Sequence, residues 1–160
     1  MKRIEAAISI AAKPDQVWGH LTDFAAYPDW NPFVQQIEGS LDVGKRLKVR
    51  IVPPGGKGST FRPRILIVIP GRQLRWVGSL RVPGLFRGEH WFRIEPADGG
   101  SRFVQGEVFS GLLVPIMGGI LDKTLTGFET MNAALKDRAE KQYRETAGSI
   151  PCEEHLLPGQ

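Results

Sequence analysis

Cysteine is almost absent from this sequence, and histidine is scarce. Cys152 is the single cysteine among 160 residues, and the three histidines are His20, His90 and His155. One cysteine cannot form a disulfide within the chain or a cysteine-based metal site. The histidines fall on an expected helix, an expected strand and the C-terminal segment, with no zinc-site spacing. We therefore expect no metal, no cofactor and a reducing compartment.

Long hydrophobic runs are missing too. No stretch approaches the roughly 18 consecutive apolar residues that a membrane helix needs. The first ten residues, MKRIEAAISI, hold only a short apolar stretch that Glu5 interrupts, unlike a secretory signal. We expect a cytoplasmic protein without stable membrane insertion.

A strong charge of one sign is absent as well. The formal net charge is +4, and lysine and arginine are scattered among apolar or acidic neighbours. Such spacing is typical of solvated strand and helix faces, so we expect no nucleic-acid binding. The sequence leaves open a homodimer, and also a protein-interaction role for a basic outer face.

What the sequence does have is alternation over most of its length. Apolar residues at every second position predict a strand at 3–10, and Pro14 begins a short helix that ends near Asp23. A second short helical turn carries Phe24, Tyr27 and Trp30. Six more strands follow, at 33–38, 46–52, 60–69, 73–78, 86–95 and 101–110. Short connections predict an antiparallel, seven-stranded curved sheet in an α+β fold.

The last predicted element is a long helix from about 112 to 146. Apolar residues recur there every three or four positions, which gives the helix one apolar face. Gly118 and Gly119 lie inside this range, and each weakens a helix by roughly 1 kcal/mol relative to alanine. We therefore expect a kink or a close backbone approach at this pair.

One helix, roughly 10 Å across, cannot fill the concave side of so wide a twisted sheet. Either large side chains fill the remaining space or a ligand cavity persists there, and periodicity alone favours neither. Seven aromatic residues are expected to face inward: Phe33, Phe61, Trp76, Phe92, Phe103, Phe109 and Phe128.

Polar residues interrupt this apolar face on two neighbouring strands. His90 lies two positions before Phe92, so both side chains should face the same side of their strand. Gln105 and Glu107 should face the same side as Phe103 for the same reason. A hairpin turn at 98–101 would place His90 beside Glu107. Such a pair could satisfy itself structurally, anchor a polar ligand group, or act as an acid and base.

The segment AKPDQVWGHLTDFAAYPDWNP, at 12–32, resembles the opening of the SRPBCC superfamily, also called START-like or Bet v 1-like. Further similarities are PRILI at 63–67, GEHWFRIEP at 88–96, GGSR at 99–102 and FSG at 109–111. The resemblance covers about residues 2–145 and includes the polyketide cyclase/dehydrase and lipid-transport families. It implies the helix-grip fold, with a ligand cavity between the sheet and the long helix.

Function must be inferred from the site, because this superfamily contains both enzymes and carriers. We expect a domain at 1–147 with a loose tail at 148–160, and a non-catalytic role in binding a hydrophobic small molecule or lipid. An enzyme that uses His90 and Glu107 as acid and base is the alternative. The expected ligand contacts are Trp30, Phe33, Phe61, Trp76, His90, Phe92, Phe103, Gln105, Glu107, Ile120 and Phe128.

Overall fold

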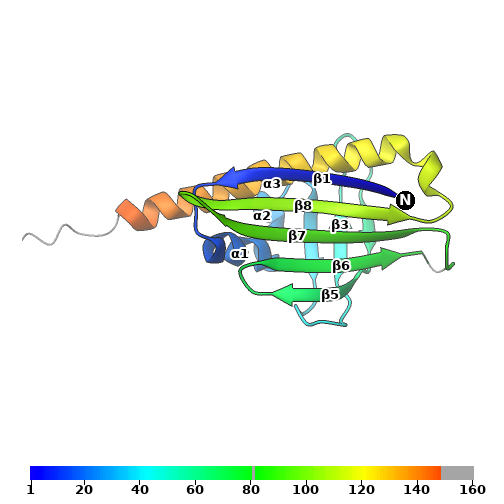
Figure 1. Cartoon of the computed structure of the whole chain (residues 1–160), viewed down its shortest axis with the longest axis horizontal. Coiled ribbons are helices and arrows are strands. Elements are labelled where there is room, and N and C mark those ends of the chain that lie inside the picture. The colour runs from blue at the N-terminus through cyan, green and yellow to red at the C-terminus, as the bar shows by residue number, and fades with distance from the viewer. Residues whose placement is uncertain (81, 149–160) are drawn as a thin grey trace, which may run out of the picture.

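The structure is a computed structural model that describes residues 1–80 and 82–148. It is an α+β helix-grip fold, in which an antiparallel sheet faces one long C-terminal helix (Figure 1). The strands are β1 (Lys2–Ile10), β2 (Val34–Glu38), β3 (Lys48–Ile51), β4 (Ser59–Phe61), β5 (Arg64–Ile69), β6 (Gln73–Ser79), β7 (Arg87–Ala97) and β8 (Gly100–Ser110). The helices are α1 (Pro14–Thr22), η1 (Phe24–Ala26), α2 (Tyr27–Trp30), η2 (Val114–Ile116) and α3 (Gly118–Gly148). Almost all of the expected tail lies outside the described residues.

The described residues form eight strands in two sheets, not the seven expected. Five strands pair in the order β1-β8-β7-β6-β5, and three pair in the order β2-β3-β4. The expected strand at 60–69 is divided by Pro63, which has no backbone N–H for a strand ladder. Its first part pairs with β3 and its second part with β6. Backbone hydrogen bonds from Leu47 to Pro63 and from Ile65 to Lys45 keep the two sheets adjacent.

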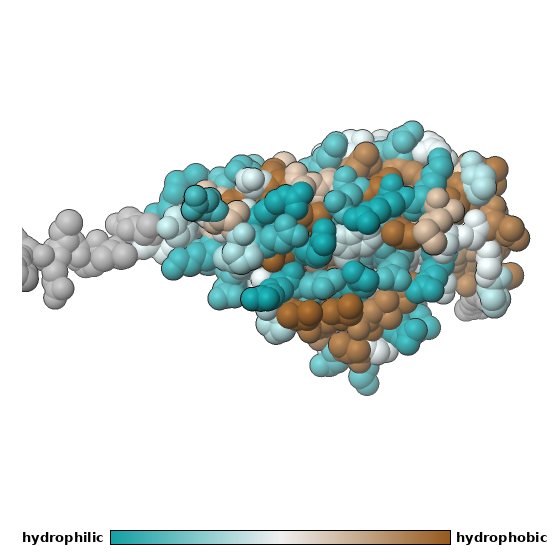
Figure 2. Space-filling model, in the orientation of Figure 1, coloured by the Kyte–Doolittle hydropathy of each residue, from teal (hydrophilic) through white to brown (hydrophobic). Residues whose placement is uncertain are grey.

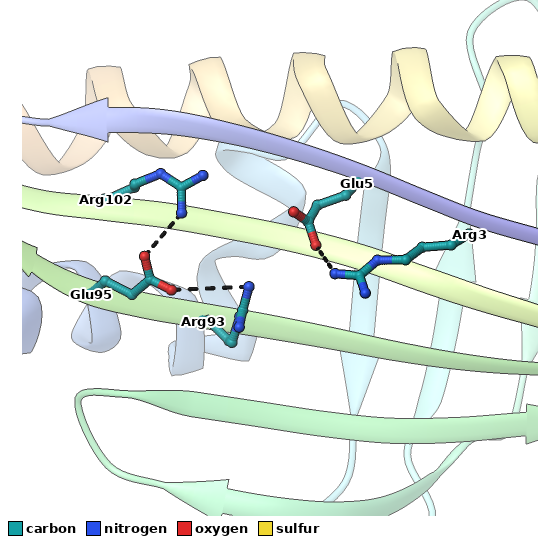
Figure 3. A network of polar contacts seen from close by, with 5 residues as sticks. All are labelled: Arg3, Glu5, Arg93, Glu95 and Arg102. Atoms are coloured by element: carbon teal, nitrogen blue, oxygen red, sulfur yellow. Dashed lines mark hydrogen bonds and ion pairs between the residues drawn. The ribbon is translucent and has the colours of Figure 1, made fainter.

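The β7–β8 hairpin has the expected register. Glu95 pairs with Arg102 and His90 pairs with Glu107 across the two strands. The turn uses Gly99 with a φ of +73°, a conformation that favours glycine. On the outer face of the sheet, Glu95 accepts a hydrogen bond from Arg102 at 2.9 Å and lies 3.9 Å from Arg93 (Figure 3). Alternation therefore aims His90 and Glu107 toward the helix side.

The start of the long helix corrects one expectation. A separate 3₁₀ turn, η2, precedes α3, so Gly118 and Gly119 begin the helix and do not kink it. A Cβ added at either glycine would meet no atom within 4 Å, so there is no close approach here. The close approach is at Gly127, where a Cβ would collide with the Phe33 ring. Glycine at position 127 therefore lets the Phe33 ring approach the helix backbone closely.

The C-terminal half of α3 is attached by specific polar contacts. Lys136 donates to the backbone carbonyl of Ser9 at 2.8 Å, and Glu140 accepts from the backbone N–H of Ala11 at 2.8 Å. These bonds join α3 to the end of β1 and to the residues that follow it. At the other end of α3, Ile120 is 55% exposed.

The loop between β6 and β7 packs against the segment that leads into α3. Leu112 and Leu113 donate backbone hydrogen bonds to Gly84 and Leu85 in this loop. Hydrophobic residues gather at this end of the molecule, while much of the outer sheet face is hydrophilic (Figure 2). Leu112 is 81% exposed. None of the described helices is both long and apolar enough to cross a membrane.

Candidate ligand site

His90 lies on β7, at the centre of an aromatic cluster beneath α3. Its ring stacks on Trp76 with centroids 5.3 Å apart, lies 4.4 Å from the Phe92 ring, and meets the Phe128 ring edge-on at 5.0 Å. The residue is only 5% exposed. Three aromatic neighbours thus fix the imidazole plane.

Glu107 lies across the hairpin from this imidazole. The His90 Nδ1 atom is 3.4 Å from Glu107 Oε2, which is a long hydrogen bond and confirms the expected proximity. The carboxylate is also close to Gly88, since a Cβ added there would collide with Glu107 Oε1. Glycine at position 88 therefore makes room for the carboxylate that faces His90.

Gln105 and Asn132 continue the polar set toward the helix. Gln105 Nε2 donates to the Phe128 carbonyl at 3.0 Å and to Asn132 Oδ1 at 2.6 Å. Both residues are buried, with exposed fractions of 0% and 2%. Asn132 was not among the expected contacts. Its signal in the sequence is a polar residue four positions after Phe128 and three before Leu135, on the buried stripe of the helix.

Three atoms of this set have no hydrogen-bond partner among the described residues. They are His90 Nε2, Gln105 Oε1 and Asn132 Nδ2, and each is shielded from solvent. A buried polar atom without a partner destabilises a protein by about 1–3 kcal/mol. Three such atoms in one aromatic region therefore indicate a place where a polar group from outside the chain would be stabilised.

The other expected contacts divide into an interior group and a surface group. Phe33, Trp76, Phe92, Phe103 and Phe128 are buried in the same core cluster. The structure corrects the expectation that Phe61 and Ile120 lie inside. Phe61 is the last residue of the short edge strand β4 and is 44% exposed, and Ile120, in the first turn of α3, is 55% exposed.

Trp30 is partly buried and packs edge-on against Tyr27, with ring centroids 5.1 Å apart. It also lines an open hollow of about 670 Å³ with Asn31, Gln36 and Arg50. This hollow lies outside the interface between the five-stranded sheet and α3. The expected closure of a pocket end by Trp30 stays a prediction.

A second hollow lies on the outer face of the five-stranded sheet. It measures about 230 Å³ and includes Trp91, Arg75 and Arg93. The guanidinium of Arg3 lies 4.9 Å above the Trp91 ring, and that arginine also pairs with Glu5 (Figure 3). Neither hollow is the cavity expected between the sheet and α3, so that cavity stays a prediction. Within the two described ranges, no three metal-ligating side chains gather.

Two ionisable groups near the helix have shifted pKa values. Burial and the nearby Arg138 guanidinium lower the pKa of His20, whose Nδ1 accepts from Arg138 Nε at 3.2 Å. The hydrogen bond from the Ala11 backbone, followed by that from Lys136, lowers the pKa of Glu140. Both groups support the attachment of α3 and lie outside the polar set at His90.

The antiparallel sheet, the long C-terminal helix and the aromatic interface define a helix-grip protein of the START-like class. Residues 1–140 match the family described as polyketide cyclase / dehydrase and lipid transport, and the chain belongs to that family. The resemblance to the SRPBCC superfamily is thereby confirmed. No curated protein matches the sequence significantly.

Solved structures show the same fold at low sequence identity. The Zhui aromatase/cyclase from Streptomyces sp. R1128 is 17% identical with a TM-score of 0.74, and the match covers 93% of this chain and 99% of that one. Protein CV1439 from Chromobacterium violaceum is 19% identical with a TM-score of 0.66, over 86% and 96% of the two chains. Ara h 8.0201 is 18% identical with a TM-score of 0.57, over 84% and 97%.

Proposed function

We propose that this protein binds an apolar small molecule or lipid between the five-stranded sheet and α3, without transforming it. The observation that carries the proposal is the set of three unpartnered polar atoms on His90, Gln105 and Asn132. Aromatic rings surround this set, and Glu107 orients His90. An apolar wall with a few fixed polar groups is the usual composition of a small-molecule site.

The family description supports this function, because it includes lipid transport. The domain proposed for it is 1–147. A ligand would contact Phe92, Phe103 and Phe128 with its apolar body and the polar set with one end. The cytoplasmic location, the homodimer and the expected lack of nucleic-acid binding remain predictions.

The first test is native mass spectrometry of the freshly purified chain, followed by titration with the apolar fluorophore N-phenyl-1-naphthylamine. We expect a retained small molecule, or saturable uptake of one fluorophore per chain. Substitution of His90 by alanine should weaken uptake, while Ile120→Ala at the exposed start of α3 should leave it unchanged. A protein that holds no molecule and takes up no fluorophore would refute the binding function.

The second candidate is an enzyme of the cyclase or dehydrase type. It is favoured by the Nδ1 contact of His90 with Glu107, because this leaves Nε2 free to exchange a proton with a bound molecule. The Streptomyces protein of the same fold is an aromatase/cyclase by name. With a polyketide-like test substrate, Glu107→Gln separates the two functions. An enzyme would lose turnover far more than affinity, whereas a binding protein would show no turnover before or after the change.

A further inference from the structure

We propose that the polar group of the bound molecule is a hydroxyl, of an alcohol or a phenol, held between Gln105 and Asn132 beside His90. This inference rests on the binding function proposed above and names the chemistry of the group that the site recognises. Its basis is the assignment of a donor or acceptor role to each unpartnered atom in the interface.

The Phe128 carbonyl fixes the orientation of the Gln105 amide. A carbonyl only accepts hydrogen bonds, so the Gln105 atom that faces it at 3.0 Å must be the Nε2 donor. The same Nε2 lies 2.6 Å from the Asn132 side chain, which must therefore present its Oδ1 acceptor. By elimination, Gln105 is left with a free acceptor, Oε1, and Asn132 with a free donor, Nδ2.

The role of His90 follows from its other contact. For this proposal we assign a neutral ring to His90 with its proton on Nδ1, the atom that faces the Glu107 carboxylate, so that Nε2 is an acceptor. On the hairpin, His90 pairs with Glu107 and Phe92 pairs with Gln105. His90 and Gln105 are therefore diagonal neighbours on the same face of the sheet. The free atoms are then two acceptors and one donor.

Few simple organic groups complement that set. A hydroxyl can donate to Gln105 Oε1 or His90 Nε2 while it accepts from Asn132 Nδ2. A ketone or an ether only accepts, which would leave both acceptors of the site unpaired. A carboxylate would also bring a buried charge against the Gln105 oxygen, which is unfavourable without a cationic partner. Among these groups only the hydroxyl both donates and accepts, which is why the proposal names an O–H group on an otherwise apolar molecule.

Water offers the same donor and acceptor, so a ligand has to compete with water for these atoms. A hydroxyl that replaces water keeps the hydrogen bonds and adds apolar contact with the rings. A methoxy group displaces the water but cannot restore the bonds to the two acceptors. The preference between these two groups is thus the measurable consequence.

The experiment titrates the full chain, freed of co-purified molecules, by calorimetry with naphthalene, 2-naphthol, 2-methoxynaphthalene and 2-naphthoate. We expect 2-naphthol to bind at least about tenfold more tightly than the methoxy compound, the ratio for roughly one well-formed hydrogen bond. Equal binding of all four compounds would overturn the hydroxyl inference and leave the binding function standing. No binding by any of them would overturn the binding function, and the inference with it.

Two variants assign the preference to the named atoms. Asn132→Leu removes the free donor, and Gln105→Met removes the free acceptor; each replaces an amide with an apolar side chain of similar size. Both should abolish the preference for 2-naphthol and retain naphthalene binding. Ala133→Leu, an exposed position next to Asn132, is the matched control and should keep the preference. An unchanged preference in either folded interior variant would overturn the assignment.

Discussion

Replacement of Asn132 by leucine should make the ligand-free protein more stable, although it removes a hydrogen bond. The native amide donates through Nδ2 to no described residue, which destabilises the fold by about 1–3 kcal/mol. The bond that would be lost, from Gln105 Nε2 to Asn132 Oδ1, contributes about 0.5–1.5 kcal/mol. Gln105 Nε2 would keep its bond to the Phe128 carbonyl and so would not become unpaired.

The balance is a stabilisation of about 1 kcal/mol, with a few tenths more from the higher helix propensity of leucine. For a domain of this size, 1 kcal/mol raises the melting temperature by about 2–4 °C. Urea unfolding of ligand-free protein, followed by circular dichroism, measures the free energy directly. Ala133→Leu is the control for a leucine placed on the helix outside the interface.

A loss of more than about 1 kcal/mol in Asn132→Leu would contradict this reasoning. It would mean that the amide is already hydrogen-bonded in the ligand-free protein, so that its removal loses bonds that stabilise the fold. A gain in stability together with a loss of hydroxyl preference would instead show a residue kept for binding at the expense of stability.

Three further predictions concern packing and pH. Gly127→Ala should destabilise the fold by about 1–3 kcal/mol, because its Cβ would collide with the Phe33 ring, whereas Gly119→Ala in open space should stabilise it by up to about 1 kcal/mol; chemical denaturation compares the two. The lowered pKa of His20 means that the folded state binds fewer protons than the unfolded state, so stability should be full above pH 6.5 and fall as the pH drops below it, and His20→Gln should flatten this slope. The pKa of Glu140 is also lowered, so its carboxylate stabilises the fold above pH 4.5, and this contribution is lost as the pH falls further. Glu140→Gln should therefore reduce stability at neutral pH and weaken the acid dependence in the same titration.

The sequence predicts the parts of this fold that depend on local pattern. Alternation and a glycine turn are enough to pair His90 with Glu107, because a tight hairpin fixes register over the whole strand. The order of elements and the apolar stripe of α3 follow from periodicity in the same way. The single strand expected at 60–69 was wrong, because Pro63 cannot continue a strand ladder and divides this segment between the two sheets.

The rest depends on contacts between distant segments. Parity places Phe61 on an apolar face, but only the tertiary structure shows that its short strand lies at an edge. Helical spacing assigns Ile120 to the inner stripe, yet its side chain is 55% exposed, while its neighbour Leu121 is buried. Asn132 was missed because a single polar residue on an apolar helix stripe does not by itself predict a site. Only its hydrogen bond with Gln105, across the interface, shows that it belongs to the polar set.

The two ends of α3 are attached to the rest of the fold by different kinds of contact. The bonds of Lys136 and Glu140 to the chain around the end of β1 hold the C-terminal half against the sheet. The first turn has no such bond to the sheet among the described residues, and two glycines there lie in open space. Leu121, just after this turn, is buried with Phe109 and Val114, so the N-terminal end of α3 is held by apolar contacts where the C-terminal half is held by polar bonds.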